Sequence, residues 1–152
     1  MASKGDVEHS EKIAKTLKEL NVSYAMRIAS AHKVPLRALE IVQEHDKEPI
    51  VFVTVAGRSN ALSAFVDAAT SRPVIACPPY SEKFAGADIY SSIRMPSGVC
   101  PLFVLEPEQA ALAAAKILAL SDKKIQDQVT KYQQKKRDEL YKDDQDILKS
   151  QS

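Results

Sequence analysis

The stretch Ile50-Val51-Phe52-Val53-Thr54-Val55-Ala56, which runs directly into Gly57-Arg58-Ser59-Asn60, decides the fold of this chain. Its first seven residues are almost all apolar and rich in β-branched side chains, as in a strand that is buried on both faces. Such strands belong to parallel sheets with helices packed on either side. The polar turn at 57–60 then stands at the carboxyl end of the strand, where open parallel sheets bind ligands.

A second strand with a polar end precedes it. Residues 22–28 form an apolar run, Ser30-Ala31-His32-Lys33 follows, and a helix is predicted from Leu36 to Glu44. Ser30 supplies a hydroxyl, Lys33 a cationic donor, and His32 a proton acceptor that works near neutral pH. This combination suggests a site for a phosphorylated substrate that gains or loses a proton.

The rest of the chain alternates between predicted strands and helices. Further strands are expected at 73–77 and 101–105, and helices at 7–20, 61–70 and 107–120, with Asp6 as the cap of the first helix. The less regular segment 80–98 can hold a helix over 86–94. From residue 121 the chain is highly charged, and a last helix is expected that carries an apolar stripe and frays after Tyr141; the stripe is formed by Ile125, Val129 and Tyr132.

This alternation predicts an α/β protein, a flavodoxin-like three-layer α/β/α sandwich with a parallel sheet. A doubly wound domain normally opens with a strand, yet only Met1 and Ala2 precede Ser3. Either the opening strand lies upstream of this chain's start, or the sheet does without it.

Composition excludes several function classes. The 152 residues match one ordinary domain, with 45% hydrophobic and 27% charged residues. A net charge of +1 gives no argument for nucleic acid or an anionic membrane, and no signal peptide or membrane-length apolar run is present. Cys77 and Cys100 are predicted to be buried, reduced thiols of a cytosolic protein. His9 and His45 are predicted to be solvated helix residues.

Four motifs together resemble those of the PurE family. They are Ser30-Ala31-His32-Lys33, Ala56-Gly57-Arg58-Ser59-Asn60, Cys77-Pro78-Pro79 and Ser91-Ser92-Ile93-Arg94-Met95-Pro96-Ser97-Gly98. Lys33 and the turn at 57–60 look like the class II branch, the aminoimidazole ribonucleotide (AIR) carboxylases of purine biosynthesis. The resemblance covers roughly residues 1 to 125.

The resemblance implies a reaction and an assembly. The reaction is reversible carboxylation of AIR by CO2 to 4-carboxy-AIR (CAIR), without ATP, biotin or metal. The expected assembly is a cytoplasmic homo-octamer with active sites at subunit junctions. Residues 1–121 would be the catalytic domain, and residues 122–152 a C-terminal helix and tail that packs on a neighbouring subunit.

The resemblance also implies residue roles. His32 would be the catalytic proton shuttle, and Asp6 would accept hydrogen bonds from the ribose hydroxyls. Ser3 and Ser30, with Arg58 or Lys33, would hold the phosphate; the alternative for Arg58 is a salt bridge between subunits. Candidates to bind the new carboxylate are Lys33, Gly57, Ser59 and Asn60, and candidates to line the cleft are Asp88, Ser91, Ser92 and Arg94.

The first loop departs from the family pattern, because Ala2 replaces a glycine and Gly5 replaces a serine. Two alternatives therefore stay open beside the carboxylase. One is class I mutase chemistry on N-carboxyaminoimidazole ribonucleotide, and the other is a non-catalytic subunit that binds a phosphoribosyl ligand or supports assembly.

Overall fold

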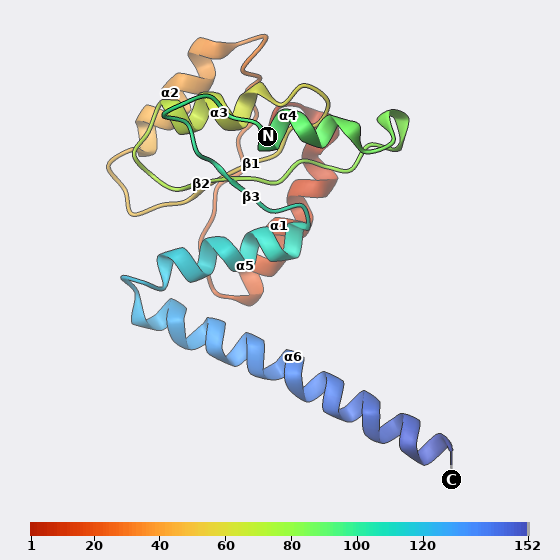
Figure 1. Cartoon of the computed structure of the whole chain (residues 1–152). Helices are drawn as coiled ribbons and strands as arrows, with labels where there is room; N and C mark the ends of the chain where they lie inside the picture. The colour runs from red at the N-terminus through yellow and green to blue at the C-terminus, as the bar shows by residue number, and fades with distance from the viewer. Residues whose placement is uncertain (152) are drawn as a thin grey trace.

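Three short strands form a parallel sheet in the computed structural model, which describes residues 1–151 (Figure 1). The strands are β1 (Phe52–Thr54), β2 (Val74–Ala76) and β3 (Leu102–Phe103), in the order β1-β2-β3. Phe52 pairs with Val74, and Ile75 pairs with Leu102. The predicted parallel sheet is confirmed, although each strand is shorter than the sequence indicated.

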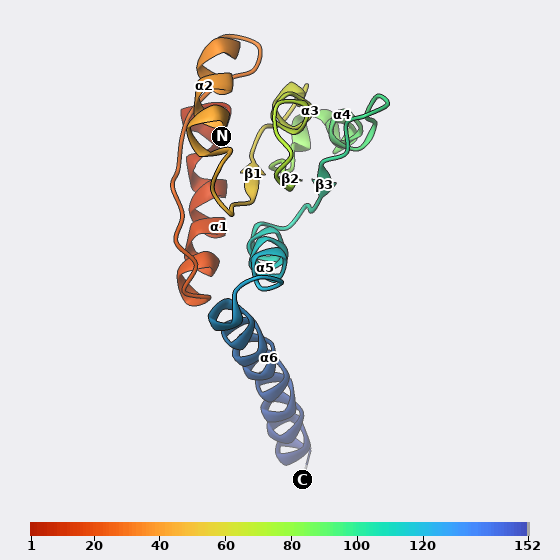
Figure 2. The same cartoon turned by 90° about the vertical axis from the view of Figure 1, so that its left-hand side faces the viewer.

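The strand predicted over residues 22–28 was wrong. This segment is extended but forms no ladder with β1. Figure 2 shows it running along α1 (Val7–Glu19), apart from β1. At its start the Val22 N–H donates to the Leu17 carbonyl at 2.9 Å, and near its end the Met1 ammonium donates to the Arg27 carbonyl at 2.9 Å and the Ala29 N–H donates to the Met1 carbonyl at 3.0 Å. An apolar run becomes a strand only where a neighbour offers backbone partners.

Helices cover both faces of the sheet, as the three-layer prediction required. On one face, α1 (Val7–Glu19) and α5 (Pro107–Leu118) pack with Ile75 and Cys77 in a first core cluster. On the other face, α2 (Pro35–His45) and α3 (Ala61–Ala68) pack with Val74 in a second core cluster. Figure 2 shows α1 and α5 below and beside the strands, with α3 above them.

The sequence signals at the helix starts act in two different ways. Pro35 and Pro107 occupy the first turns of α2 and α5, where a missing N–H costs nothing. Asn60 caps α3 by accepting from the Ser63 N–H. Asp6 does stand at the N-cap position of α1, but its carboxylate makes no cap bond there. The expected side-chain cap is therefore absent, because that carboxylate turns back toward Ser3.

The irregular segment after β2 contains three short helices rather than the one helix that the sequence allowed over 86–94. They are η2 (Glu82–Phe84), η3 (Ala87–Ile89) and α4 (Tyr90–Ile93), and a further 3-10 turn, η1 (Lys4–Asp6), precedes α1. Ala85 and Gly86 both have positive φ angles, 49° and 75°, so the chain bends sharply between η2 and η3.

The last helix, α6 (Lys123–Ser150), is continuous, so the predicted fraying after Tyr141 was wrong. Its first turns pack on the first core cluster through the predicted stripe, in which Val129 is 7% exposed and Ile125 and Tyr132 are partly buried. Both views show the remainder pointing away from the other elements (Figures 1 and 2). Over residues 1–151, no helix combines the length and apolar character that a membrane crossing requires.

Candidate functional site

Three polar loops leave the sheet at the same edge. The Ala2 N–H donates to the Val55 carbonyl at 2.9 Å, and the Ala29 N–H donates to the Met1 carbonyl at 3.0 Å. Ser3 follows Ala2, Ser30 follows Ala29, and Gly57 stands two residues beyond Val55. The first loop, the 30–33 turn and the 57–60 turn therefore begin side by side at the carboxyl ends of neighbouring segments.

The first loop is held by a pair of the predicted site residues. Asp6 Oδ2 accepts from the Ser3 N–H at 2.8 Å and from Ser3 Oγ at 2.9 Å. Ser3 is exposed and Asp6 is partly buried. The pair leaves the second carboxylate oxygen of Asp6 without a protein partner among residues 1–151, so that oxygen can accept a ligand hydroxyl.

The 30–33 turn presents its cation and its imidazole to solvent. The Lys33 N–H donates to Ser30 Oγ at 3.3 Å, and the Val34 N–H donates to the Ser30 carbonyl at 2.9 Å. Ser30 therefore shapes the turn, while the side chains of His32 and Lys33 stay exposed. An exposed imidazole at the sheet edge can exchange a proton with a ligand that lies against these loops.

The 57–60 turn is clamped by the segment that follows β2. Asp88 Oδ2 accepts from the Arg58 N–H at 2.9 Å, and Ser91 Oγ donates to the Arg58 carbonyl at 2.8 Å. Arg58 needs this support because its φ is 59°, in the left-handed region that costs a non-glycine residue about 1–2 kcal/mol. Asp88 and Ser91, which were predicted to line the cleft, hold the backbone of this turn through these two bonds.

Asn60 is also structural in its contacts. Its side chain is 2% exposed, donates to Ser63 Oγ at 2.7 Å and to Ser92 Oγ at 2.9 Å, and accepts from the Ser63 N–H. Its own N–H donates to Ser91 Oγ at 3.0 Å. Both amide hydrogens and the backbone N–H are used, so Asn60 holds the turn and has no donor left for a substrate carboxylate.

The remaining predicted residues differ in exposure. Arg58, Ser59 and Arg94 are exposed, Gly57 is half-buried and Ser92 is buried. A methyl group on Gly57 would lie 3.5 Å from Pro79 and 3.9 Å from Asp88, in ordinary contact. Gly57 therefore marks a point where the loops after β1 and β2 approach each other. The exposed guanidinium of Arg58 makes no hydrogen bond or ion pair within residues 1–151.

Sequence reasoning missed a contact between α1 and the end of β2. His9 Nε2 lies 3.4 Å from Cys77 Sγ, and His9 is half-buried, which corrects its prediction as a solvated residue. Burial, with the Lys12 charge, lowers the pKa of His9, while burial and nearby acidic residues raise the pKa of Cys77 to about 12. Cys77 is thus a thiol at neutral pH and no candidate nucleophile. The two residues are 68 positions apart, and no spacing signal could have joined them.

The predictions for the remaining histidine and for the two cysteines have different outcomes. His45 is partly buried and pairs with Glu48 at 3.1 Å. Cys77 is buried as expected, but Cys100 is exposed, so its predicted burial was wrong. Cys100 stands just before β3, where its N–H donates to Asp67 Oδ2 at 2.7 Å and its side chain meets solvent.

Comparison with known proteins shows which family this chain is similar to. Residues 1–139 match the family model described as AIR carboxylase. A phosphoribosylaminoimidazole carboxylase from Archaeoglobus fulgidus is 60% identical over 147 residues, which span 97% of this chain and 82% of that protein. A protein of the same name from Treponema denticola is 49% identical over 146 residues, which span 95% of this chain and 92% of that protein. The crystal structure of Treponema denticola PurE matches with a TM-score of 0.94 at 48% identity, over 97% of this chain and 94% of that one.

Proposed function

The chain belongs to the AIR carboxylase family, and from that premise we propose that it carboxylates AIR reversibly with CO2 to give CAIR in purine biosynthesis. The observation that carries this proposal is the similarity to carboxylases over nearly the whole chain, with His32 exposed at the edge where the three polar loops begin. The same names favour the carboxylase over the class I mutase and over a non-catalytic subunit.

The reaction requires that AIR and CO2 be held together and that one proton be transferred. The exocyclic amine of AIR pushes electrons into the ring, so a ring carbon attacks the carbon of CO2 and a C–C bond forms. That ring carbon then carries both the new carboxylate and its original hydrogen. His32 accepts the hydrogen as a proton, which restores the aromatic ring; in the reverse direction it returns the proton and CO2 leaves. A neutral imidazole suits this step near pH 7, and holding the two reactants together supplies the rest of the gain.

The loop contacts support a division of binding roles. Ser3 and Ser30, with the exposed cation of Arg58 or of Lys33, bind the phosphate, because charge-assisted bonds are the strongest available to it. The free oxygen of Asp6 accepts from the ribose. The N–H groups of Gly57 and Ser59, the Ser59 hydroxyl and Lys33 face the new carboxylate, while Asp88, Ser91 and Asn60 position the 57–60 turn.

We infer that the reaction uses no ATP, biotin or metal, because CO2 is already an electrophile and needs only to be held against the ring. We also infer a cytoplasmic location, which suits the two free cysteines of the chain. The assembly is proposed to be a homo-octamer. Large apolar side chains exposed on the segment after β2 support contacts between copies, since Tyr80 is 64% and Tyr90 62% exposed.

The replacement His32→Asn tests the proton shuttle. We expect at least about a 100-fold loss of kcat for carboxylation, the usual contribution of a positioned acid–base group, with AIR binding by calorimetry unchanged. His45→Asn is the matched control, because His45 lies on α2 away from the three loops, and it should keep full turnover. Undiminished kcat in the His32 variant would reject the role of that imidazole.

A further inference from the structure

The 57–60 turn leaves only two of its four backbone N–H groups available to a ligand. The N–H groups of Arg58 and Asn60 donate to side chains of the segment after β2, at 2.9 and 3.0 Å. Within residues 1–151, the N–H groups of Gly57 and Ser59 have no acceptor. Free N–H groups on one turn can form a concave site for an anion. The bonds to the segment after β2 thus take alternate donors and leave the other two for a carboxylate.

The side chain of Asn60 fixes the end of this turn. It is 2% exposed, and its Oδ1 accepts from the Ser63 N–H at 3.2 Å. Because a backbone N–H can only donate, this bond shows which end of the amide is the oxygen. The amide nitrogen then donates to Ser63 Oγ at 2.7 Å and to Ser92 Oγ at 2.9 Å. Both of its hydrogens are therefore directed to hydroxyl groups, one on α3 and one on α4.

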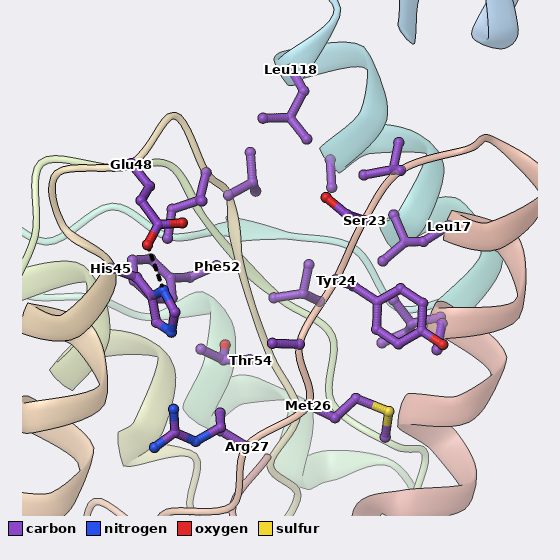
Figure 3. Close-up of a pocket in the computed structure, with 18 of the residues that line it drawn as sticks. Leu17, Ser23, Tyr24, Met26, Arg27, His45, Glu48, Phe52, Thr54 and Leu118 are labelled. Carbon is purple, nitrogen blue, oxygen red and sulfur yellow. Dashed lines mark hydrogen bonds and ion pairs between the residues drawn. The ribbon is translucent and has the colours of Figure 1, made fainter.

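The bond to Ser63 begins a directed chain of hydrogen bonds that ends in the sheet. Since the Asn60 nitrogen can only donate, Ser63 Oγ accepts and its own hydrogen is left for Thr54 Oγ1, which lies 2.9 Å away. Thr54, labelled in Figure 3, stands at the end of β1 and donates to the Ile75 carbonyl at 3.2 Å. Each hydroxyl in the chain accepts once and donates once. This branch connects Asn60 to the core of the sheet.

The other branch depends on a single hydroxyl group. Ser92 is 1% exposed, and Asn60 is the only hydrogen-bond partner of its side chain within residues 1–151. Replacement of that hydroxyl would leave one hydrogen of the Asn60 amide buried without an acceptor, and buried polar groups are rarely left unpaired. Ser92 therefore determines whether the Asn60 side chain stays bonded to α4.

From these contacts we propose that Ser92 is a positioning residue for the side of the site that receives CO2 and holds the new carboxylate. Buried as it is, Ser92 acts through Asn60, which in turn holds the adjacent Ser59 N–H in one direction. Donors that are fixed in advance stabilise developing charge most, because they need no reorganisation during the reaction. The inference rests on the proposed carboxylation, which supplies the identity of the anion.

This role predicts an effect on one of the two reactants. The phosphate and ribose of AIR are assigned to the first loop and the 30–33 turn, whose hydrogen bonds do not involve Ser92. The backbone of Arg58 also keeps its own two bonds when Ser92 is replaced. A looser Asn60 should therefore impair the use of CO2 and leave the affinity for AIR intact.

The replacements Ser92→Ala and Ser92→Cys test the proposal. The first removes the hydroxyl, and the second keeps a side chain of similar size that is only a weak acceptor. In both we expect kcat/KM for CO2, measured by varying bicarbonate at fixed pH, to fall at least about tenfold, with the Kd for AIR from calorimetry changed less than about twofold. The side-chain amide protons of Asn60 should also lose protection against hydrogen exchange, measured by NMR.

The replacement Val66→Ala is the control for a general loss of stability. Val66 is 6% exposed on α3 and belongs to the second core cluster, so its truncation lowers the unfolding midpoint without removing a hydrogen bond. It should keep kcat/KM for CO2 within about twofold of the parent value, because the Asn60 contacts remain.

Three results would overturn the proposal. Unchanged kcat/KM for CO2 in the Ser92 variants, or an equal loss in Val66→Ala, would reject the positioning role while the parent chain still forms CAIR. A Kd for AIR that rises as much as kcat/KM for CO2 falls would show that Ser92 supports the whole site and not its carboxylate side. A parent chain that forms no CAIR from AIR and bicarbonate would reject the proposed function, and this inference with it. Should Ser92→Ala fail to fold, Ser92→Cys gives the same comparison.

Discussion

Arg58 combines a left-handed backbone with a guanidinium that is free to bind an anion. The replacement Arg58→Gly removes the guanidinium and relieves the backbone strain, so stability and substrate binding report the two features separately. Stability should change by less than about 1 kcal/mol, because relief of the left-handed strain is offset by the larger chain entropy of glycine. The KM for AIR should rise at least about tenfold if the guanidinium holds the phosphate. Arg58→Lys should recover part of that loss, and an unchanged KM in the glycine variant would assign the side chain to another contact.

His9 predicts a pH dependence of stability. Its pKa is lowered in the folded chain, chiefly by burial and then by Lys12, so below about pH 6.5 the unfolded chain binds a proton that the folded chain resists. This destabilises the fold as pH falls from about 6.5 through the lowered pKa. In urea unfolding at pH 7.5 and 5.5, His9→Gln should lose less stability than the parent chain. An equal loss in both would show that other groups carry the dependence.

At the residue scale, the sequence predicted where the polar loops lie, but not which side chains are used up in holding the loops in place. Ser30, His32, Lys33 and the 57–60 turn were predicted to meet at one edge, and the hydrogen bonds of Met1 and Ala2 bring their segments there. Local sequence could not reveal that Asn60 also donates to Ser92, because that bond depends on how α4 docks.

At the element scale, helices with clear apolar periodicity or proline starts were predicted nearly to the residue, as α5 and its Pro107 show. The extended segment 22–28 was not, because strand formation depends on a neighbour that local sequence does not describe. The predicted fraying at the end of α6 was wrong for a related reason. A charged sequence favours fraying in an isolated helix, but ion pairs such as Lys136–Glu139 at 2.8 Å can support an exposed helix.

The outer half of α6 predicts a contact between copies of the chain. Leu140, Tyr141, Ile147 and Leu148 are exposed and recur at a spacing of seven residues, so they share one face of the helix. Leu140→Glu combined with Ile147→Glu should reduce the mass measured by light scattering below that of the parent assembly, with an unchanged circular dichroism spectrum. Gln145→Glu adds a charge on the same helix and is the control. An unchanged mass in the double variant would place the contact elsewhere.

At the scale of the whole molecule, the fold and the site depend on the same arrangement. Two core clusters hold helices on both faces of the sheet, and the polar loops all leave at its carboxyl edge. The sheet positions the loops, the contacts of Asp88 and Ser91 hold the 57–60 turn, and His32 is proposed as the proton acceptor. We therefore expect catalysis by positioning and proton transfer, with no energy-rich cosubstrate.

The most direct test of that claim is to mix the purified chain with AIR and isotopically labelled bicarbonate, with ATP absent, avidin added to block biotin and EDTA added to bind metals. We expect labelled CAIR, formed at a rate proportional to the amount of protein. Formation of CAIR only from N-carboxyaminoimidazole ribonucleotide, with none above background from AIR and bicarbonate, would contradict it.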